Sequence, residues 1–371
     1  MKKDTTHTIR RAEHFKTILT GEGFLVGLIA GLVVLLYRVL LEYAGRAMNV
    51  ILGYARENPA AAGAWFVLLF LMACIVGKLV KWEPMISGSG IPQVEGEMTG
   101  KLEQIWWRVL PAKFLGGFLS LLAGLSLGRE GPSIQIGAMT GKALSRILDR
   151  GKTEEKYLLT CGASAGLAAA FHAPLAGVMF SLEEIHKNFS VSVLVSVMTA
   201  SITADYVSSQ FLGFHSVFQF DIGAEIQPRY YWHILILGVI LGLLGAFYNK
   251  MTLWVQNLYY KAKGLNETSR LLIPFLLAGV LGLFVPQVLG SGHDLIETAA
   301  GGEMLLGTLL GFLVLKFVFS LISFGSGVPG GIFFPLLVLG ALIGGSYGTF
   351  AAQYMGLDPS YISNFVLLAM A

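Results

Sequence analysis

The stretch that decides the fold is Gly128–Pro132 (Gly-Arg-Glu-Gly-Pro), together with Gly88–Pro92 (Gly-Ser-Gly-Ile-Pro), which begins 40 residues earlier. Related stretches follow in the second half at Gly290–Gly292 (Gly-Ser-Gly) and at Gly325–Pro335 (Gly-Ser-Gly-Val-Pro-Gly-Gly-Ile-Phe-Phe-Pro), which begin 35 residues apart. All four lie beside strongly apolar sequence. Helices interrupted by glycine and proline at matching places of two halves are typical of a membrane transporter with its site at the interruptions.

The composition indicates a polytopic, all-α membrane protein. The chain is 54% hydrophobic and 13% charged with 46 glycines, whereas soluble domains carry roughly 25% charged residues. The apolar stretches, most of them near the ~20 residues that span a bilayer core, are 24–46, 59–80, 109–127, 191–214, 231–256, 271–289, 303–324 and 331–352. The net charge of +3 comes with no basic stripe, so no nucleic-acid partner is expected. Cys74 and Cys161 are isolated and predict no metal site.

Two apolar segments predict broken or re-entrant helices. Residues 131–143 suit a helix that starts at Pro132 and crosses only part of the bilayer, and residues 158–185 are interrupted at Phe171–Pro174. Broken helices leave backbone amides unsatisfied at bilayer depth, where they are tolerated only inside protein or beside a ligand cavity.

The predicted organisation is one transmembrane domain, 1–371, with a first repeat at about 20–205 and an incomplete second repeat at about 230–371. Residues 1–20 form a basic lead without the apolar core of a signal peptide, so the positive-inside tendency places them in the cytoplasm. Residues 362–371 begin an apolar segment that stops after about half a span. We therefore expect further C-terminal helices that this sequence lacks.

The glycine stretches have three possible meanings. A phosphate loop requires Gly-x4-Gly-Lys-Ser/Thr, and the nearest match, Gly137–Ala143, lacks both the spacing and the hydroxyl. Helix packing explains Gly27 and Gly31, because Gly-x3-Gly is common between membrane helices. Packing does not require Pro, Arg and Glu beside the glycines. An anion site at helix N-termini does, and it is the favoured interpretation.

Acidic residues near these stretches suggest proton chemistry. Arg129 and Glu130 lie in an apolar stretch. Adjacent residues of a helix point about 100° apart, so these two side chains rarely form an ion pair with each other. A carboxylate that is desolvated and unpaired takes up a proton readily. Glu130 would then compete with an anion when charged and leave when neutral. Glu183 and Glu184 are either an interfacial polar boundary or a second proton-exchanging site.

A hydrolase remains an alternative. Gly162–Gly166 (Gly-Ala-Ser-Ala-Gly) matches the nucleophile-elbow pattern, with Ser164 as nucleophile and His172 or His186 as base. The elbow requires a preceding strand, whereas this segment is helical in character, so close helix packing explains it better.

The motifs at 88–92, 128–132 and 331–335 (Gly-Ile-Phe-Phe-Pro) resemble the CLC family of chloride channels and chloride/proton antiporters. Residues 166–177 also resemble that family, and the resemblance covers the chain from about residue 20. It implies two topologically inverted repeats, a homodimer with one pathway per subunit, bound chloride and no other cofactor or metal.

The resemblance also implies roles for individual residues. Ser89 would give its hydroxyl to chloride, and the backbone amides of Ile332 and Phe333 would bind the same ion. Glu130 would be the gating glutamate, and Glu184 the internal proton-transfer glutamate of the antiporter branch. The supporting loop residues are Gly88, Gly90, Pro92, Gly128, Arg129, Gly131, Pro132, Gly331 and Pro335.

Two departures from the family pattern stand out. His172 occupies a position where bacterial relatives commonly have Asn, and the late helix whose tyrosine closes the chloride site has no counterpart before Ala371. We expect a chloride/proton antiporter, a secondary transporter rather than an enzyme, in lipid of a prokaryotic plasma (inner) membrane. A passive chloride channel of the same fold is the first alternative and an intramembrane serine hydrolase the remote one.

Overall fold

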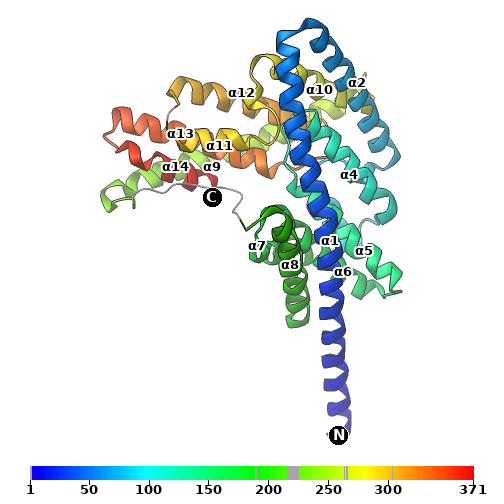
Figure 1. Ribbon diagram of the computed structural model, residues 1–371. Helices are drawn as coiled ribbons and strands as arrows, with labels where there is room; N and C mark the ends of the chain where they lie inside the picture. Colours follow the sequence, from blue (N-terminus) through cyan, green and yellow to red (C-terminus); the bar gives the residue numbers. More distant parts are fainter. Residues whose placement is uncertain (1, 189, 215–224, 263, 265, 303) are drawn as a thin grey trace. The chain divides into compact units, whose positions relative to one another are not determined.

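The computed structural model describes residues 2–188, 190–214, 225–262, 264, 266–302 and 304–371, with side chains from residue 16 onward. The described residues are almost entirely helical, as the composition predicts (Figure 1). The α-helices are α1 (Lys2–Glu57), α2 (Pro59–Trp82), α3 (Ile91–Met98), α4 (Trp106–Leu122), α5 (Glu130–Ile147), α6 (Lys152–Phe171), α7 (Pro174–Phe180), α8 (Val191–Leu212), α9 (Tyr231–Lys261), α10 (Glu267–Phe284), α11 (His293–Ala300), α12 (Leu306–Gly325), α13 (Phe333–Tyr354) and α14 (Ile362–Met370). Short 3₁₀ turns at Pro84–Ile86, Pro286–Val288, Pro228–Tyr230 and Pro359–Tyr361 and a π-helical turn at Ser181–His186 complete the described elements.

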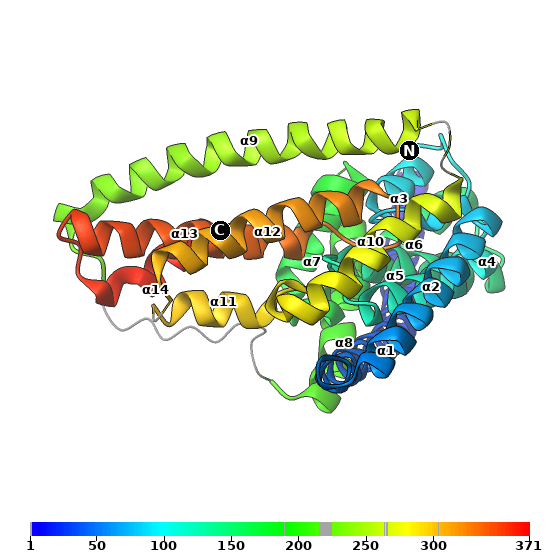
Figure 2. The same cartoon turned by 90° about the horizontal axis from the view of Figure 1, so that it is seen from above.

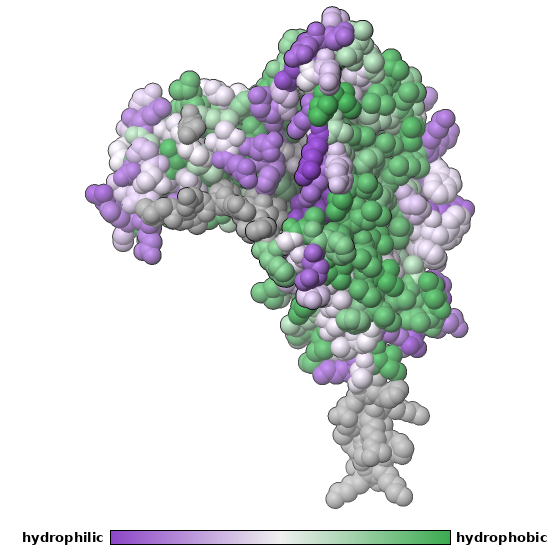
Figure 3. All heavy atoms as spheres, viewed as in Figure 1, coloured by the Kyte–Doolittle hydropathy of each residue, from purple (hydrophilic) through white to green (hydrophobic). Residues whose placement is uncertain are grey.

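Seven helices of the described chain are long and apolar enough to cross a bilayer. They are Lys16–Glu57 of α1, α2, α8, Pro228–Lys261 around α9, α10, α12 and α13. The outward side of α2 is apolar, with Val67 60% exposed, and the space-filling view shows a broad hydrophobic surface there (Figure 3). Such a surface matches lipid rather than water, so the chain is an integral membrane protein.

The described chain packs as two compact units. Unit 1 comprises residues 1–42, 83–115 and 129–217, and unit 2 comprises residues 43–82, 116–128 and 218–371. The units interleave along the sequence, so they do not coincide with the predicted repeats at about 20–205 and 230–371. The repeats concern the order of elements, and their bounds stay a prediction.

In unit 1, α5 and α6 cross with their backbones almost in contact. A Cβ atom on Gly137 would lie 2.2 Å from the carbonyl oxygen of Gly162, and one on Gly166 would lie 2.2 Å from that of Ser133. Real Cβ atoms do not approach oxygen so closely, so only glycine permits this crossing. The Gly-Ala-Ser-Ala-Gly segment is therefore a packing face of α6.

The crossing of α1 with α8 in unit 1 has the same basis. A Cβ atom on Gly27 would lie 2.4 Å from the carbonyl oxygen of Ala200, and one on Gly31 would lie 2.9 Å from the Cα atom of Ala204. The prediction that Gly27 and Gly31 are packing glycines is confirmed.

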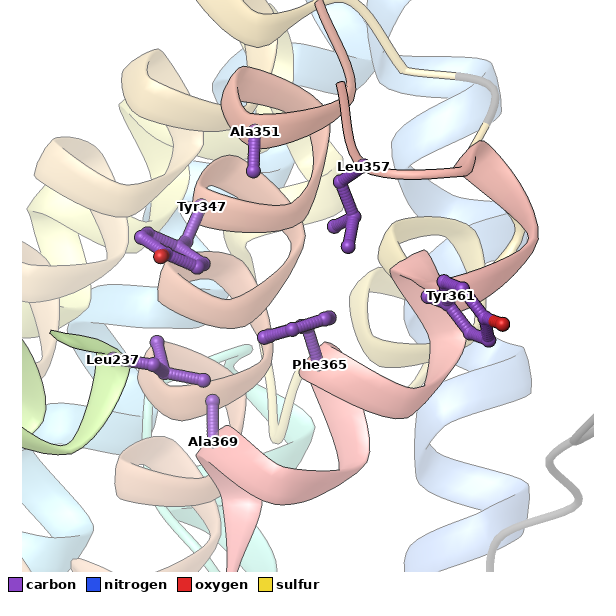
Figure 4. Close-up of a cluster of buried hydrophobic side chains, with 7 residues drawn as sticks. All are labelled: Leu237, Tyr347, Ala351, Leu357, Tyr361, Phe365 and Ala369. Atoms are coloured by element: carbon purple, nitrogen blue, oxygen red, sulfur yellow. The ribbon is translucent and has the colours of Figure 1, made fainter. Parts of the chain in front are cut away.

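In unit 2, α13 and α14 form the corresponding hairpin, and α9 runs beside α12 and α13 (Figure 2). A Cβ atom on Gly344 would lie 2.4 Å from the carbonyl oxygen of Phe365. The Phe365 side chain fills the space between α13 and α14 in a cluster with Leu237, Tyr347 and Tyr361 (Figure 4).

The two halves of the described chain repeat one order of elements. In the first half the 3₁₀ turn Pro84–Ile86 precedes α3, α4 and α5, and in the second half the turn Pro286–Val288 precedes α11, α12 and α13. Each short helix, α3 and α11, follows a glycine with positive φ, Gly90 at 94° and Gly292 at 87°. The matching interruptions predicted from the sequence are confirmed as element boundaries.

Three details differ from or sharpen the sequence predictions. The helix expected to start at Pro132 starts at Glu130 and has 18 residues, about 27 Å, because proline is compatible with the first turn of a helix. The basic lead belongs to the first part of α1, which begins at Lys2, although Met1 and the side chains up to residue 15 lie outside the described part. The interruption at Phe171–Pro174 is confirmed, since α6 ends at Phe171 and α7 begins at Pro174.

Candidate functional site

The Gly-Ser-Gly loop in unit 1 presents Ser89 between two glycines that no other residue replaces easily. Gly88 has φ 65° and Gly90 has φ 94°, both in the region that favours glycine. The Ser89 Oγ atom accepts a hydrogen bond from the Ile91 backbone N–H at 3.2 Å. A hydroxyl that accepts here still has its own O–H to donate, as anion binding requires.

Close packing joins this loop to α5. A Cβ atom on Gly131 would lie 2.6 Å from the carbonyl oxygen of Ser89, and one on Gly90 would lie 2.3 Å from Oε1 of Gln135. The Gln135 Nε2 atom donates to the Met85 carbonyl oxygen at 2.9 Å. The glycines of the motifs at 88–92 and 128–132 therefore allow the first turn of α5 to sit directly against Ser89 within unit 1.

A buried lysine holds the loop from behind. The Lys113 side chain on α4 is 0% exposed, and its Nζ atom donates to the carbonyl oxygens of Ile86 at 2.8 Å and Gly88 at 2.6 Å. Carbonyls left without donors at an interrupted helix are costly when buried. The Lys113 side chain satisfies two of these carbonyls.

Unit 2 contains the same arrangement. Lys316 on α12 is 0% exposed, and its Nζ atom donates to the carbonyl oxygens of Val288 at 2.9 Å and Gly290 at 2.8 Å. Neither lysine was predicted as part of the site from the sequence. The signal was available, because each is a lone cation within an apolar stretch, 25 and 26 residues after the first glycine of its Gly-Ser-Gly loop.

Glu130 is the first residue of α5, and its side chain is 2% exposed. The first N–H groups of a helix have no intrahelical acceptor and carry a partial positive charge of about +0.5, which favours a carboxylate or another anion there. Glu130 and Arg129 both act electrostatically on the buried hydroxyl of Tyr37, so these three side chains of unit 1 share one environment.

The start of α13 in unit 2 is the counterpart. Ile332 is its N-cap and Phe333 its first residue, half exposed at 50%. Two reciprocal hydrogen bonds of 2.8 Å join the backbones of Gly128 and Gly331, both in unit 2. Each of these glycines lies two residues before the first residue of its helix, α5 or α13.

The predicted site residues thus divide between the units. Ser89, Glu130 and Gly131 belong to unit 1, where the close packing of Ser89 with Gly131 connects them. Ile332 and Phe333 belong to unit 2. The predicted single site shared by both sets stays a proposal.

Glu183 and Glu184 lie in the π-helical turn Ser181–His186 and are exposed. π-Helical turns are rare in proteins, and those that do occur are often found at functional sites. Next to the turn, Lys187 forms an ion pair with Glu95, and the Glu95 carboxylate raises the pKa of Lys187, with a smaller contribution from Glu184. Glu184 is therefore solvated and faces a cation, which suits either an interfacial charge or a proton-exchanging carboxylate.

The residues of the hydrolase alternative do not form a catalytic group. Ser164 Oγ is buried and has no hydrogen-bond partner among the described residues. The imidazole of His186 is bonded through Nδ1 to Thr160 Oγ1 at 3.0 Å, and that of His172 through Nδ1 to Asp205 at 3.3 Å. A nucleophile without a base in hydrogen-bond reach is not activated.

His172 ends α6 with a left-handed backbone, φ 53°. Among residues with a Cβ atom, Asn, Asp and His are enriched in this conformation, which accounts for an exchange between His and Asn at this position. Its side chain also contacts Ser209 Oγ at 3.2 Å, so His172 connects the end of α6 to α8.

A second polar network in unit 1 was not predicted. Lys142 on α5 forms a buried ion pair with Glu97 on α3, and Gln104 Nε2 donates to Glu97 at 3.0 Å. Gln135 Nε2 donates to Gln104 Oε1 at 2.7 Å. The network links α3 to α5 behind the Ser89 loop and lacks a sequence signature, because its members come from three separate segments.

The chain is similar to known transport proteins. Residues 68–371 match the family model described as voltage gated chloride channel. The H(+)/Cl(-) exchange transporters ClcA of Salmonella paratyphi B and Salmonella newport are each 38% identical over 303 residues, which cover 80% of this chain and 63% of the relative. The chain thus spans less than two thirds of the length of these relatives.

Solved structures agree on the fold. A slow cyanobacterial Cl-/H+ antiporter matches with a TM-score of 0.86 and 26% identity, over 95% of this chain and 88% of that one. A CLC-type fluoride/proton antiporter matches with a TM-score of 0.77 and 22% identity, over 95% and 85% respectively. With the interrupted helices, the paired glycine loops and the family match over most of its length, the chain belongs to the CLC (voltage gated chloride channel) family.

Proposed function

We propose that this protein is a chloride/proton antiporter, a secondary transporter that exchanges chloride for protons across the membrane. The support comes from the glycine loops, from a buried carboxylate beside one of them, and from relatives that are named as exchangers of these two ions.

Chloride would bind to the Ser89 hydroxyl and to the backbone amides of Ile332 and Phe333. Helix N-termini provide N–H donors and partial positive charge without full charges that would hold the ion too tightly. Within unit 2, the reciprocal bonds between Gly128 and Gly331 fix the backbone that leads into α13.

Glu130 would gate this site. The observation that carries the proposal is a carboxylate that is 2% exposed at the first residue of α5, one residue before the Gly131 that packs on Ser89. Charged, the carboxylate competes with an anion for the same helix terminus. When protonated, the side chain loses that attraction and an anion displaces it. The uptake of a proton by Glu130 and the entry of chloride would therefore be coupled at one site.

Glu184 would exchange protons with the cytoplasm, given its exposure on the π-helical turn. A cytoplasmic N-terminus, a prokaryotic inner membrane, surrounding lipid and a homodimer complete the proposal, from the basic lead and the family resemblance. A passive chloride channel of the same fold is the alternative, favoured if Glu184 is only an interfacial charge.

The test uses the full chain in liposomes loaded with chloride, with external chloride and pH recorded together. Antiport predicts chloride efflux with uphill proton uptake that persists when an ionophore clamps the voltage. Chloride efflux without proton movement would identify a channel, and the absence of both fluxes would contradict the proposal.

A further inference from the structure

A line of buried side chains in unit 1 leads from an ion pair to the Ser89 loop. Lys142 on α5 forms the ion pair with Glu97 on α3, and its Nζ atom also donates to the Gln104 carbonyl oxygen at 2.6 Å. Gln104 Nε2 donates to Oε2 of Glu97 at 3.0 Å. Gln104 Oε1 accepts from Gln135 Nε2 at 2.7 Å. Each side chain is therefore hydrogen-bonded to the next.

The ion pair determines which way both amides face. A carboxylate only accepts hydrogen bonds, so Gln104 directs Nε2 toward Glu97 and Oε1 toward Gln135. Gln135 in turn directs Nε2 toward two acceptors, Gln104 Oε1 and the Met85 carbonyl oxygen, which lies at 2.9 Å. Turning the Gln135 amide around would place oxygen against oxygen at both contacts. The orientation of Gln135 is therefore fixed by a charge on α3.

This orientation holds Gln135 against the Ser89 loop. Its Oε1 atom is buried, has no hydrogen-bond partner among the described residues, and faces Gly90, where a Cβ atom would lie 2.3 Å from it. Gly90 follows Ser89 directly, and the next N–H along the chain, that of Ile91, donates to Ser89 Oγ at 3.2 Å. The position of Gly90 therefore decides where the Ser89 hydroxyl lies.

Stability alone does not account for the network. The only other acid that acts electrostatically on Glu97 is Glu155, which forms its own ion pair with Arg146 among the described side chains. A buried ion pair adds little net stability over apolar side chains of the same size. A fully bonded polar network does fix one arrangement of its members, which apolar side chains would not do.

We propose that Gln135 is a positioning residue for chloride binding at Ser89, and that the Lys142–Glu97 ion pair sets its orientation through Gln104. The inference rests on the proposed function, because the anion at Ser89 is then the transported chloride. Gln135 does not bind the ion itself. It acts through the backbone of Gly90.

The experiment measures initial exchange rates of the full chain in liposomes as a function of chloride concentration. Gln104→Met keeps the size of the side chain and removes its bonds to Glu97 and Gln135. We expect the half-saturating chloride concentration to rise about two- to tenfold, the range for one neutral hydrogen bond, while the rate at saturation stays within about twofold. Thr140→Val is the control, since the Thr140 hydroxyl donates to the Ile136 carbonyl oxygen of its own helix at 2.9 Å.

A double-mutant cycle separates positioning from general damage to the fold. Gln135→Met should raise the half-saturating concentration as Gln104→Met does, and the double variant should raise it no further, because both break one line of bonds. Additive effects, or an unchanged half-saturating concentration in Gln104→Met, would overturn the proposal.

A second readout does not depend on transport. Hydrogen–deuterium exchange of the peptide 86–92 should be faster in Gln104→Met than in the parent protein and unchanged in Thr140→Val. Equal exchange in Gln104→Met and the parent would show that the network does not hold the loop. A parent protein that moves no chloride would refute the proposed function, and the exchange of this peptide would still decide whether Gln104 orients the loop.

Discussion

Lys113→Met tests whether the buried ammonium holds the Ser89 loop. The substitution keeps the length of the side chain and leaves the carbonyl oxygens of Ile86 and Gly88 without their donor at 2.8 and 2.6 Å. An unsatisfied buried carbonyl costs about 1–3 kcal/mol, so two cost about 2–6 kcal/mol. The ammonium no longer has to be desolvated, which offsets part of this, and we expect a net loss of about 2–4 kcal/mol.

Lys316→Met is the matched control, because Lys316 donates to the carbonyls of Val288 and Gly290 at 2.9 and 2.8 Å. Both variants should lower the thermal unfolding midpoint in detergent by a similar amount, on the order of 5 °C. Only Lys113→Met should weaken chloride binding by calorimetry, because only its loop carries Ser89. An unchanged midpoint in both variants would refute the reasoning, and an equal loss of affinity would refute the separate role of the first loop.

Three further substitutions test other parts of the molecule. Gly137→Val should destabilise the protein by about 1–3 kcal/mol in thermal unfolding, because its Cβ would meet the Gly162 carbonyl oxygen at 2.2 Å. Gly45→Ala is the control, because the space around Gly45 is open. Equal unfolding midpoints for the two variants would contradict the close crossing of α5 and α6. His172→Asn should leave the free energy of unfolding unchanged, while His172→Val lowers it by about 1–2 kcal/mol, the cost of a left-handed backbone for a β-branched residue; the reverse order would contradict this account. Glu184→Gln should slow proton flux more than chloride flux in liposomes, and an unchanged ratio would leave Glu184 an interfacial charge.

Most of the fold was accessible from the sequence. Apolar stretches as long as a bilayer core can only be helices there, and proline with glycine marks their ends, so the long helices and the interruption at Phe171–Pro174 follow from local rules. The short helices α3 and α11 were not predicted from the sequence. The bounds were less certain where a proline fits inside a first turn, which is why α5 begins at Glu130 rather than at Pro132.

The candidate site was only partly accessible. Ser89 and Glu130 carry motif signals, whereas Lys113 became meaningful only when the structure placed its Nζ atom on the carbonyls of Ile86 and Gly88. The same applies to the Glu97 network, whose partners come from distant segments. A single sequence shows that a charge is buried, but only the folded chain shows what the charge contacts.

The central claim, that Glu130 both gates chloride and accepts the proton, is tested most directly by Glu130→Gln. The substitution keeps the shape of the side chain and removes its charge and its titration. Liposomes with this variant should release chloride and show no coupled proton uptake, whereas the parent protein shows both. Proton uptake that remains tied to chloride in Glu130→Gln would contradict the account.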